Sequence, residues 1–160
     1  MAEPSRFRLG ERSATTFRFT SHPYSPMLYN IKTGYNGIPQ RPMRDIAILV
    51  TSLRKIADDS LPFVFTDRHA NLAAARFSSD LKELNHVDWK TLGQRDFKRD
   101  PNKPEKVERY QAEALIHGAV PPSSLLGIAC YDEARAQEVN AECARCSISI
   151  RVVVRPGWFF

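Results

Sequence analysis

The sequence has few cysteines and no long hydrophobic run, and each shortage excludes a class of protein. Its 160 residues include three cysteines, an odd number that argues against a disulfide-stapled scaffold. No apolar run approaches the roughly 18 residues that a membrane helix needs, and the first twenty residues combine several arginines with no apolar signal-peptide core. We therefore predict a soluble, cytoplasmic protein without a membrane partner.

Several common catalytic and nucleotide-binding motifs are also absent. GxGxxG, GxxxxGKS/T and GxSxG do not occur, which argues against Rossmann, P-loop and α/β-hydrolase sites. Cys143 and Cys146 have CxxC spacing, but no second ligand pair follows them to complete a zinc site. We interpret them as reduced thiols near a helix end and predict no metal site.

The composition is that of a globular chain with a surplus of positive charge. Hydrophobic residues make up 42% and charged residues 26%, and one domain over residues 1–160 is long enough to bury a core. Lysine and arginine total 23 against 18 acidic residues, a formal net charge of +5. The surplus favours an anionic partner, with nucleic acid, a nucleotide and simple solubility all open.

Periodicity and turn residues predict strands and helices that alternate without a regular βαβ rhythm, which favours an α+β fold with a mixed sheet. Strands are expected at 17–19, 45–52, 62–66, 109–116, 124–131 and 147–154, and helices or helical turns at 27–31, 53–59, 71–84 and 133–144. The run at 45–52 is almost continuously apolar and predicts a buried central strand. The stretch 94–108 is basic, contains two prolines and predicts an exposed loop.

The first candidate site is the pair Gln111 and Glu113, which strand alternation over 109–116 places on one face. A carboxylate at this position can stabilise an oxocarbenium-like transition state and accept a proton from an incoming nucleophile. Gln111 can read the acceptor through hydrogen bonds. The alternative is the solvated polar face of an edge strand, and the residue types alone favour that alternative.

The second candidate site follows the apolar strand at 62–66. His69 can stack on or hydrogen-bond a base, and Arg68 can bind a phosphate. Asp67 and His69 instead allow a metal-dependent nuclease, although no further ligands with matching spacing occur. A third interpretation is that Asp67 caps the helix expected at 71–84.

The third candidate site is the segment from Ser25 to Tyr29 with the glycine-bearing loop at 32–37. Backbone amides and tyrosine rings in such a loop can hold a dinucleotide. The alternative is a surface loop over a hydrophobic plug.

Six segments, taken together, resemble the DarT family of DNA ADP-ribosyltransferase toxins. In order along the chain they are YSPMLYNIKTGYNGI (24–38), DIAILVTSL (45–53), FVFTDRHA (63–70), FSSDLKELNHVDW (77–89), RYQAEALI (109–116) and PGWFF (156–160). The resemblance implies an ADP-ribosyltransferase-like fold in which two small mixed sheets flank an NAD cleft. It also implies that NAD is consumed, that ADP-ribose is moved onto a base, thymidine, of single-stranded DNA, and that a DarG-type macrodomain antitoxin is the partner.

The resemblance assigns roles to particular residues. Glu113 matches the catalytic glutamate of the family, and the basic loop 94–108 matches the loop that presents the acceptor. Residues expected beside NAD are Ser25, Tyr29 and Tyr24, and residues expected to bind the DNA substrate are Gln111, His69, Arg109 and Tyr110.

The match departs from the family at the amino end. The sequence is expected to be short there, without the family's first NAD-binding strand, its histidine and its catalytic arginine. Arg6, Arg8 and Arg12 are the candidates to replace that arginine. The departure leaves a second hypothesis open, a catalytically inactive module that binds single-stranded DNA or a macrodomain.

Overall fold

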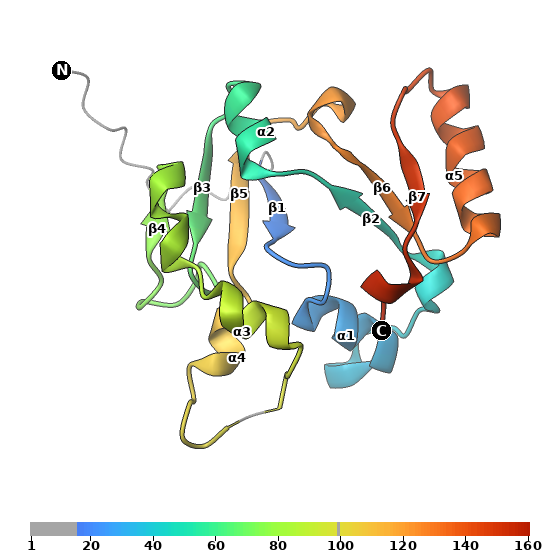
Figure 1. Ribbon diagram of the computed structural model, residues 1–160. Coiled ribbons are helices and arrows are strands. Elements are labelled where there is room, and N and C mark those ends of the chain that lie inside the picture. Colours follow the sequence, from blue (N-terminus) through green and yellow to red (C-terminus); the bar gives the residue numbers. More distant parts are fainter. Residues whose placement is uncertain (1–15, 99) are drawn as a thin grey trace.

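The computed structural model describes residues 16–98 and 100–160, which form two β-sheets lying side by side with helices around them (Figure 1). Arg6, Arg8 and Arg12 lie outside the described residues. The first sheet, called sheet A here, has four strands in the order β1-β5-β3-β4, each antiparallel to its neighbour. These strands are β1 (Thr16–Thr20), β5 (Glu113–His117), β3 (Phe63–Thr66) and β4 (Phe77–Ser78).

The second sheet, called sheet B here, has three strands in the order β2-β6-β7. They are β2 (Ala47–Val50), β6 (Gly127–Cys130) and β7 (Val152–Val154). β2 is antiparallel to β6, whereas β7 is parallel to it. The predicted α+β class with a mixed sheet is therefore confirmed.

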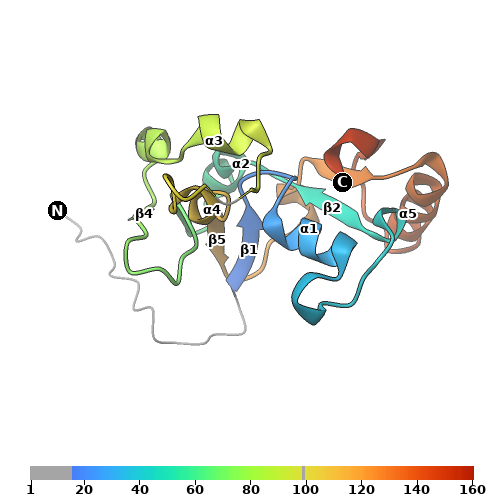
Figure 2. The same cartoon turned by 90° about the horizontal axis from the view of Figure 1, so that it is seen from below.

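Five α-helices surround the sheets in the described part of the chain, as Figure 2 shows from a second side. They are α1 (Pro26–Thr33), α2 (Leu53–Asp58), α3 (Trp89–Gln94), α4 (Lys106–Arg109) and α5 (Glu133–Arg145). Side-chain oxygens cap the first turn of four of them, and these caps are Ser25, Ser52, Asp88 and Asp132. α1 ends at Gly34, whose φ of 71° is a left-handed conformation that glycine adopts without strain.

Three groups of apolar side chains hold the layers together. One joins sheet A to α3 and includes Phe65, Leu92 and Tyr110. A second joins α1 to the carboxyl end through Leu28 and Phe159. The third packs α5 against sheet B and consists of Ile128, Cys130 and Ala136, with partly buried neighbours around them. The sheets are thus supported by separate apolar clusters.

Several predicted elements are present. β1, β3, α1, α2 and α5 match the expected segments 17–19, 62–66, 27–31, 53–59 and 133–144. The expected strands 124–131 and 147–154 are shorter, since only β6 and β7 have strand pairing within them. None of the described helices combines the length and apolar character that crossing a membrane requires.

The prediction of a buried central strand at 45–52 is wrong. β2 covers only Ala47–Val50, lies at the edge of sheet B and alternates between exposed and half-buried positions. Leu49 is 50% exposed. A continuous apolar run favours a strand that is buried on both faces, but it does not show whether other elements cover those faces or how many strands pair beside it.

The helix expected at 71–84 is absent. The chain instead forms a loop after β3, the short strand β4 and a 3₁₀ helix over Leu81–His86. Asp67 does not cap a helix, because its Oδ1 accepts a hydrogen bond from the backbone N–H of Arg76 at 2.9 Å and so closes the loop. This hydrogen bond and the pairing of β4 with β3 hold the segment in a conformation that is not helical.

The strand expected at 109–116 is also partly wrong. α4 ends at Arg109, a turn follows in which the Gln111 N–H donates to the Glu108 carbonyl at 3.0 Å, and β5 begins only at Glu113. Gln111 and Glu113 therefore do not share a strand face. Good helix-forming residues before Gln111 continue the preceding helical turn, and strand pairing decides the rest.

Candidate functional site

Glu113 is the first residue of β5, and it lies where the neighbouring strands of sheet A come to their ends. It is opposite Thr20, the last residue of β1, in the strand register. On the other side Thr66, the last residue of β3, is fully buried and its Oγ1 accepts a hydrogen bond from the Glu113 N–H at 3.3 Å. The ends of β1 and β3 and the start of β5 thus lie together at this residue, at one edge of sheet A where the strand pairing stops.

The Glu113 carboxylate is buried and has a donor at each oxygen. The residue is only 4% exposed. Oε1 accepts a hydrogen bond from the backbone N–H of Ala70 at 2.9 Å, and Oε2 lies 3.1 Å from Nε of Arg18 on β1. The alternative of a solvated polar face is therefore wrong. A carboxylate is buried only where donors replace water, and both donors here belong to segments distant in sequence.

A cavity of about 450 Å³ lies beside this position, between the edges of the two sheets. Thr20, opposite Glu113, and Ala114, the next residue of β5, line it together with Leu49 of β2. Trp89 and Trp158 add aromatic surface. Glu113 itself is not among the lining residues, because its carboxylate turns toward Ala70 and Arg18. The volume and the mostly apolar walls are typical of a small-molecule site.

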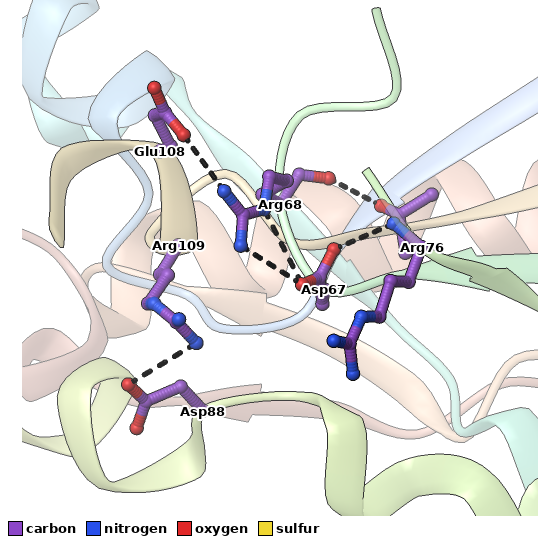
Figure 3. A network of polar contacts seen from close by, with 7 residues as sticks. Asp67, Arg68, Arg76, Asp88, Glu108 and Arg109 are labelled. Atoms are coloured by element: carbon purple, nitrogen blue, oxygen red, sulfur yellow. Dashed lines mark hydrogen bonds and ion pairs between the residues drawn. The ribbon is translucent and has the colours of Figure 1, made fainter. Parts of the chain in front are cut away.

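A network of charged groups fixes the loop that supplies the Ala70 N–H (Figure 3). The Arg68 guanidinium contacts Asp67 Oδ2 at 3.3 Å and Glu108 Oε2 of α4 at 3.1 Å. Asp67 also holds the far end of the loop through Arg76. The hydrogen bond to Asp67 is the main reason that the pKa of Arg68 lies above its ordinary value. The network joins the loop after β3 to α4.

His69 lies in this loop and is half-buried. Its Nδ1 accepts a hydrogen bond from the backbone N–H of Asn71 at 3.1 Å. With Nδ1 as an acceptor, the neutral ring carries its proton on Nε2, which is then the donor that remains. His69 is the residue before Ala70, whose N–H binds the Glu113 carboxylate. The fold therefore brings this predicted residue near Glu113.

The other predicted DNA-binding residues lie on or just after α4 and face other groups. Arg109 Nη1 is 3.8 Å from Asp88 Oδ2, and Figure 3 shows this pair with no contact to Asp67 or Arg68. Gln111 Nε2 donates to the Val107 carbonyl at 3.4 Å. Tyr110 is buried in the core, and its hydroxyl accepts a hydrogen bond from the Asp96 N–H at 2.9 Å. Tyr110 therefore supports the fold from the core, and its ring is not exposed to a ligand.

The three residues expected beside NAD are grouped around the start of α1. Ser25 is buried and caps the helix by accepting from the Leu28 N–H at 3.2 Å. Tyr24 is also buried, and its hydroxyl has no hydrogen-bond partner among the described residues. Tyr29 is 42% exposed and its ring is stacked with Phe97 at 6.3 Å. None of the three lines the cavity between the sheets.

The cysteine pair lies where the sequence predicts, at the carboxyl end of α5. Cys143 and Cys146 are free thiols, and Cys146 follows the last residue of the helix. Within residues 16–98 and 100–160, no three or more histidine, cysteine or acidic side chains are grouped as a metal site requires.

Sequence reasoning missed both partners of the Glu113 carboxylate. Arg18 alternates with Phe17 and Phe19 along β1, so the strand pattern indicated its face but not its partner. Ala70 contributes only its backbone N–H, and a backbone donor has no residue-type signal. Pairing of β5 with β1 brings Arg18 to the carboxylate, and pairing of β5 with β3 brings the loop that contains Ala70.

A comparison with protein families supports this geometry. The family described as "ssDNA thymidine ADP-ribosyltransferase, DarT" matches residues 17–160. The chain belongs to the DarT family. The match includes both sheets, Glu113 and the loop after β3, so the resemblance drawn from the six sequence segments is confirmed.

Individual DarT relatives agree with this result. A protein of Escherichia coli O127:H6 named DNA ADP-ribosyl transferase is 45% identical over 144 residues, which are 90% of this chain and 65% of that protein. A second, from Thermus sp. strain 2.9 and with the same name, is 38% identical over 86% of this chain and 65% of its own length. The chain thus spans slightly less than two thirds of these relatives.

Solved DarT structures share the fold. Thermus sp. 2.9 DarT in complex with ADP-ribosylated ssDNA has a TM-score of 0.83 and 34% identity, covering 91% of this chain and 69% of that one. The same protein in complex with NAD⁺ has a TM-score of 0.79 and 35% identity, covering 91% and 73%. The predicted ADP-ribosyltransferase-like fold with two sheets is confirmed.

Proposed function

We propose that this chain transfers ADP-ribose from NAD to a base of single-stranded DNA, thymidine, with Glu113 as the catalytic carboxylate. The observation that carries the proposal is the buried Glu113 carboxylate, held by two donors at the meeting point of three strands. Membership of the DarT family supports the reaction, and the NAD⁺ and ADP-ribosylated ssDNA complexes of the Thermus relative support both substrates.

The chemistry requires one bond to form and one to break at the anomeric carbon of the ribose. A base nitrogen bonds to that carbon while the bond to nicotinamide breaks, and nicotinamide leaves with the bonding electron pair. Glu113 stabilises the positive charge that develops on the sugar and takes the proton that the base nitrogen loses. Each carboxylate oxygen accepts one contact in the structure and so keeps a lone pair for this task.

The described residues fit NAD in two respects. The cavity between the sheets is large enough for part of a dinucleotide, and Phe19, Trp89 and Trp158 offer aromatic surface to a planar ring. The buried Tyr24 hydroxyl, which lacks a partner among the residues described, is a free polar group beside α1. We assign Ser25 and Tyr29 to the same side of the site through their place on α1, with Ser25 holding the helix end and Tyr29 facing outward.

The segment between α3 and α4 is the proposed acceptor side. Arg95, Lys98 and Lys103 are exposed cations there, so a nucleic acid strand gains affinity by releasing counterions. A single strand leaves its base edges accessible, which a duplex does not. His69, joined to this side through the Arg68–Glu108 contact, is the side chain we assign to the base, with Arg109 and Gln111 on α4 and its following turn nearby.

The partner and the compartment are also proposals. The family resemblance implies a DarG-type macrodomain that removes the modification. Free thiols at all three cysteines are consistent with the cytoplasm, where thiols stay reduced.

A mass measurement tests the reaction. The purified chain is incubated with NAD and a thymidine-containing oligonucleotide, and an added ADP-ribose is sought in the oligonucleotide. Glu113→Gln keeps an acceptor for the Ala70 N–H but loses the charge, so we expect at least about a hundredfold less product. Glu133→Gln, an exposed carboxylate on α5, is the matched control and should leave the product unchanged.

Three outcomes separate the hypotheses. Product that depends on Glu113 supports the transferase. Salt-dependent binding of the oligonucleotide with no added mass supports the binding module instead. Cleavage of the oligonucleotide that stops with a chelator would support a nuclease at Asp67 and His69 and overturn the proposal.

A further inference from the structure

The Arg95 side chain is an exposed cation without an anionic partner among the residues that the structure describes. Its guanidinium carbon lies 3.6 Å from the centroid of the Tyr24 ring. Nearby cations are paired differently, since Lys106 contacts Asp96 at 2.5 Å and Arg109 contacts Asp88. Within the described ranges no carboxylate lies at ion-pair distance from Arg95. A ring under one face of a guanidinium leaves the N–H groups at its edge free.

The backbone at Arg95 is strained for an arginine. Its φ of 54° and ψ of 26° are left-handed, at the position that follows α3. Glycine is the usual residue at such a helix end, because side chains with a Cβ are disfavoured there. Stability alone therefore does not account for arginine at this position, and strain of this kind is frequent where a side chain binds a ligand.

The segment after Arg95 is firmly held. The Asp96 N–H donates to the Tyr110 hydroxyl at 2.9 Å, and Asp96 Oδ2 binds Lys106 of α4. The Phe97 ring packs on Tyr110 with centroids 4.6 Å apart and on Phe160 at 5.5 Å. These contacts fix the chain next to Arg95, which lowers the cost of ordering the backbone at Arg95 when a ligand binds.

Arg95 lies between the cavity and the basic segment that follows α3. Beneath its guanidinium the Tyr24 ring contacts the His22 ring at 4.8 Å, and His22 lines the cavity between the sheets. In the sequence, Arg95 is the first of the exposed cations that precede α4. A ligand that extends from the cavity to this segment would pass Arg95.

We propose that Arg95 binds a phosphate ester of the substrate, using the guanidinium that Tyr24 supports. Two N–H groups of a guanidinium match two phosphate oxygens, which a lysine does not reproduce. The proposal rests on the proposed function for the identity of the substrate. The phosphate is either a phosphodiester of the DNA strand or the diphosphate of NAD, and binding measurements with each ligand alone distinguish the two.

The variant Arg95→Gly tests the proposal because glycine fits the left-handed backbone. We expect its melting temperature to equal or exceed that of the unchanged chain, while affinity for one ligand falls about tenfold or more. The probes are a fluorescent oligothymidylate, followed by anisotropy over a salt series, and NAD, followed by calorimetry. If the DNA strand is the ligand, the plot of log affinity against log salt concentration becomes less steep, and the magnitude of its slope decreases by about one. Lys90→Ala on α3 removes the same charge from an exposed position and should change neither affinity by more than about twofold.

Each result has a definite meaning. Weaker oligothymidylate binding assigns the strand phosphodiester, and weaker NAD binding assigns the diphosphate. Equal effects of Arg95→Gly and Lys90→Ala on affinity, or no effect of either, would overturn the site. Unchanged affinity of Arg95→Lys for the ligand that Arg95→Gly binds more weakly would overturn it too. Binding that depends on Arg95 without any transfer of ADP-ribose would leave the site standing and overturn only the proposed reaction.

Discussion

Sheets A and B are stabilised by different kinds of contact. Both buried carboxylates of the described residues, Asp67 and Glu113, follow or begin strands of sheet A. In sheet B all four residues of β6 are buried, and Ile128 and Cys130 pack with Ala136 of α5 in an apolar cluster. The ion pairs of α5, such as Arg145 with Glu142, are exposed.

The difference separates the sheet that carries the buried charged groups from a sheet that is held mainly by apolar packing. Apolar packing such as that of β6 stabilises a fold directly, whereas a buried carboxylate costs free energy that its donors only offset. Glu113 and Asp67 each keep such donors, and the donors of Glu113 leave a lone pair available on each carboxylate oxygen. Sheet A therefore retains charged groups that stability alone does not require.

The largest expected effect on stability is that of Arg68→Met. The variant leaves Asp67, whose side chain is 5% exposed, without its cationic partner. We expect the free energy of unfolding to fall by about 3 kcal/mol, measured by urea denaturation. Arg68→Lys should recover part of the loss. A change below about 0.5 kcal/mol would show that the charges of sheet A are as weakly coupled as surface pairs.

A comparable disruption of sheet B is Gly127→Ala. A Cβ at this position would lie 2.8 Å from the Arg151 carbonyl oxygen, a backbone atom that can move only with β7. We expect a loss of about 1–3 kcal/mol, measured by the same denaturation. If sheet B is a scaffold, the variant that remains folded keeps the oligonucleotide product at an unchanged level. Loss of product from fully folded protein would contradict the view that sheet B contributes only to stability.

A smaller effect is expected from the titration of His22. Burial, and next the charge of Arg95, hold the pKa of His22 below its ordinary value. The unfolded chain then takes up a proton before the native one, so stability falls as the pH decreases through the ordinary histidine range. The Tyr24 N–H also donates to Nδ1 at 3.2 Å, which requires that nitrogen to be unprotonated. Arg95→Gly should raise the His22 pKa, as followed by NMR; an unchanged value would show that Arg95 does not act on the ring.

The smallest effect is that of Arg145→Ala. Arg145 and Glu142 are 72% and 60% exposed, so water screens the pair. We expect no measurable change in unfolding or in product. A clear loss of stability would show that an exposed ion pair stabilises α5 as the buried Asp67–Arg68 pair is expected to stabilise sheet A.

The sequence indicated the positions of two candidate residues but not the contacts that hold them. Glu113 and His69 occur in short segments that match the family, and the structure places them near each other through Ala70. The pairing of Gln111 with Glu113 on one face was wrong, because the turn after α4 shifts where β5 begins. Periodicity over eight residues, 109–116, does not show where a helical turn gives way to a strand.

Helix starts, apolar segments and the family were determined by the sequence itself. Ser25 and Asp132 cap helices with their own side chains, which is a local interaction. Only the tertiary structure decided that β2 lies at a sheet edge, that Arg18 contacts Glu113 and that Arg95 stacks on Tyr24. These contacts join segments far apart in the chain, and their geometry depends on strand pairing and packing that residue order does not encode locally.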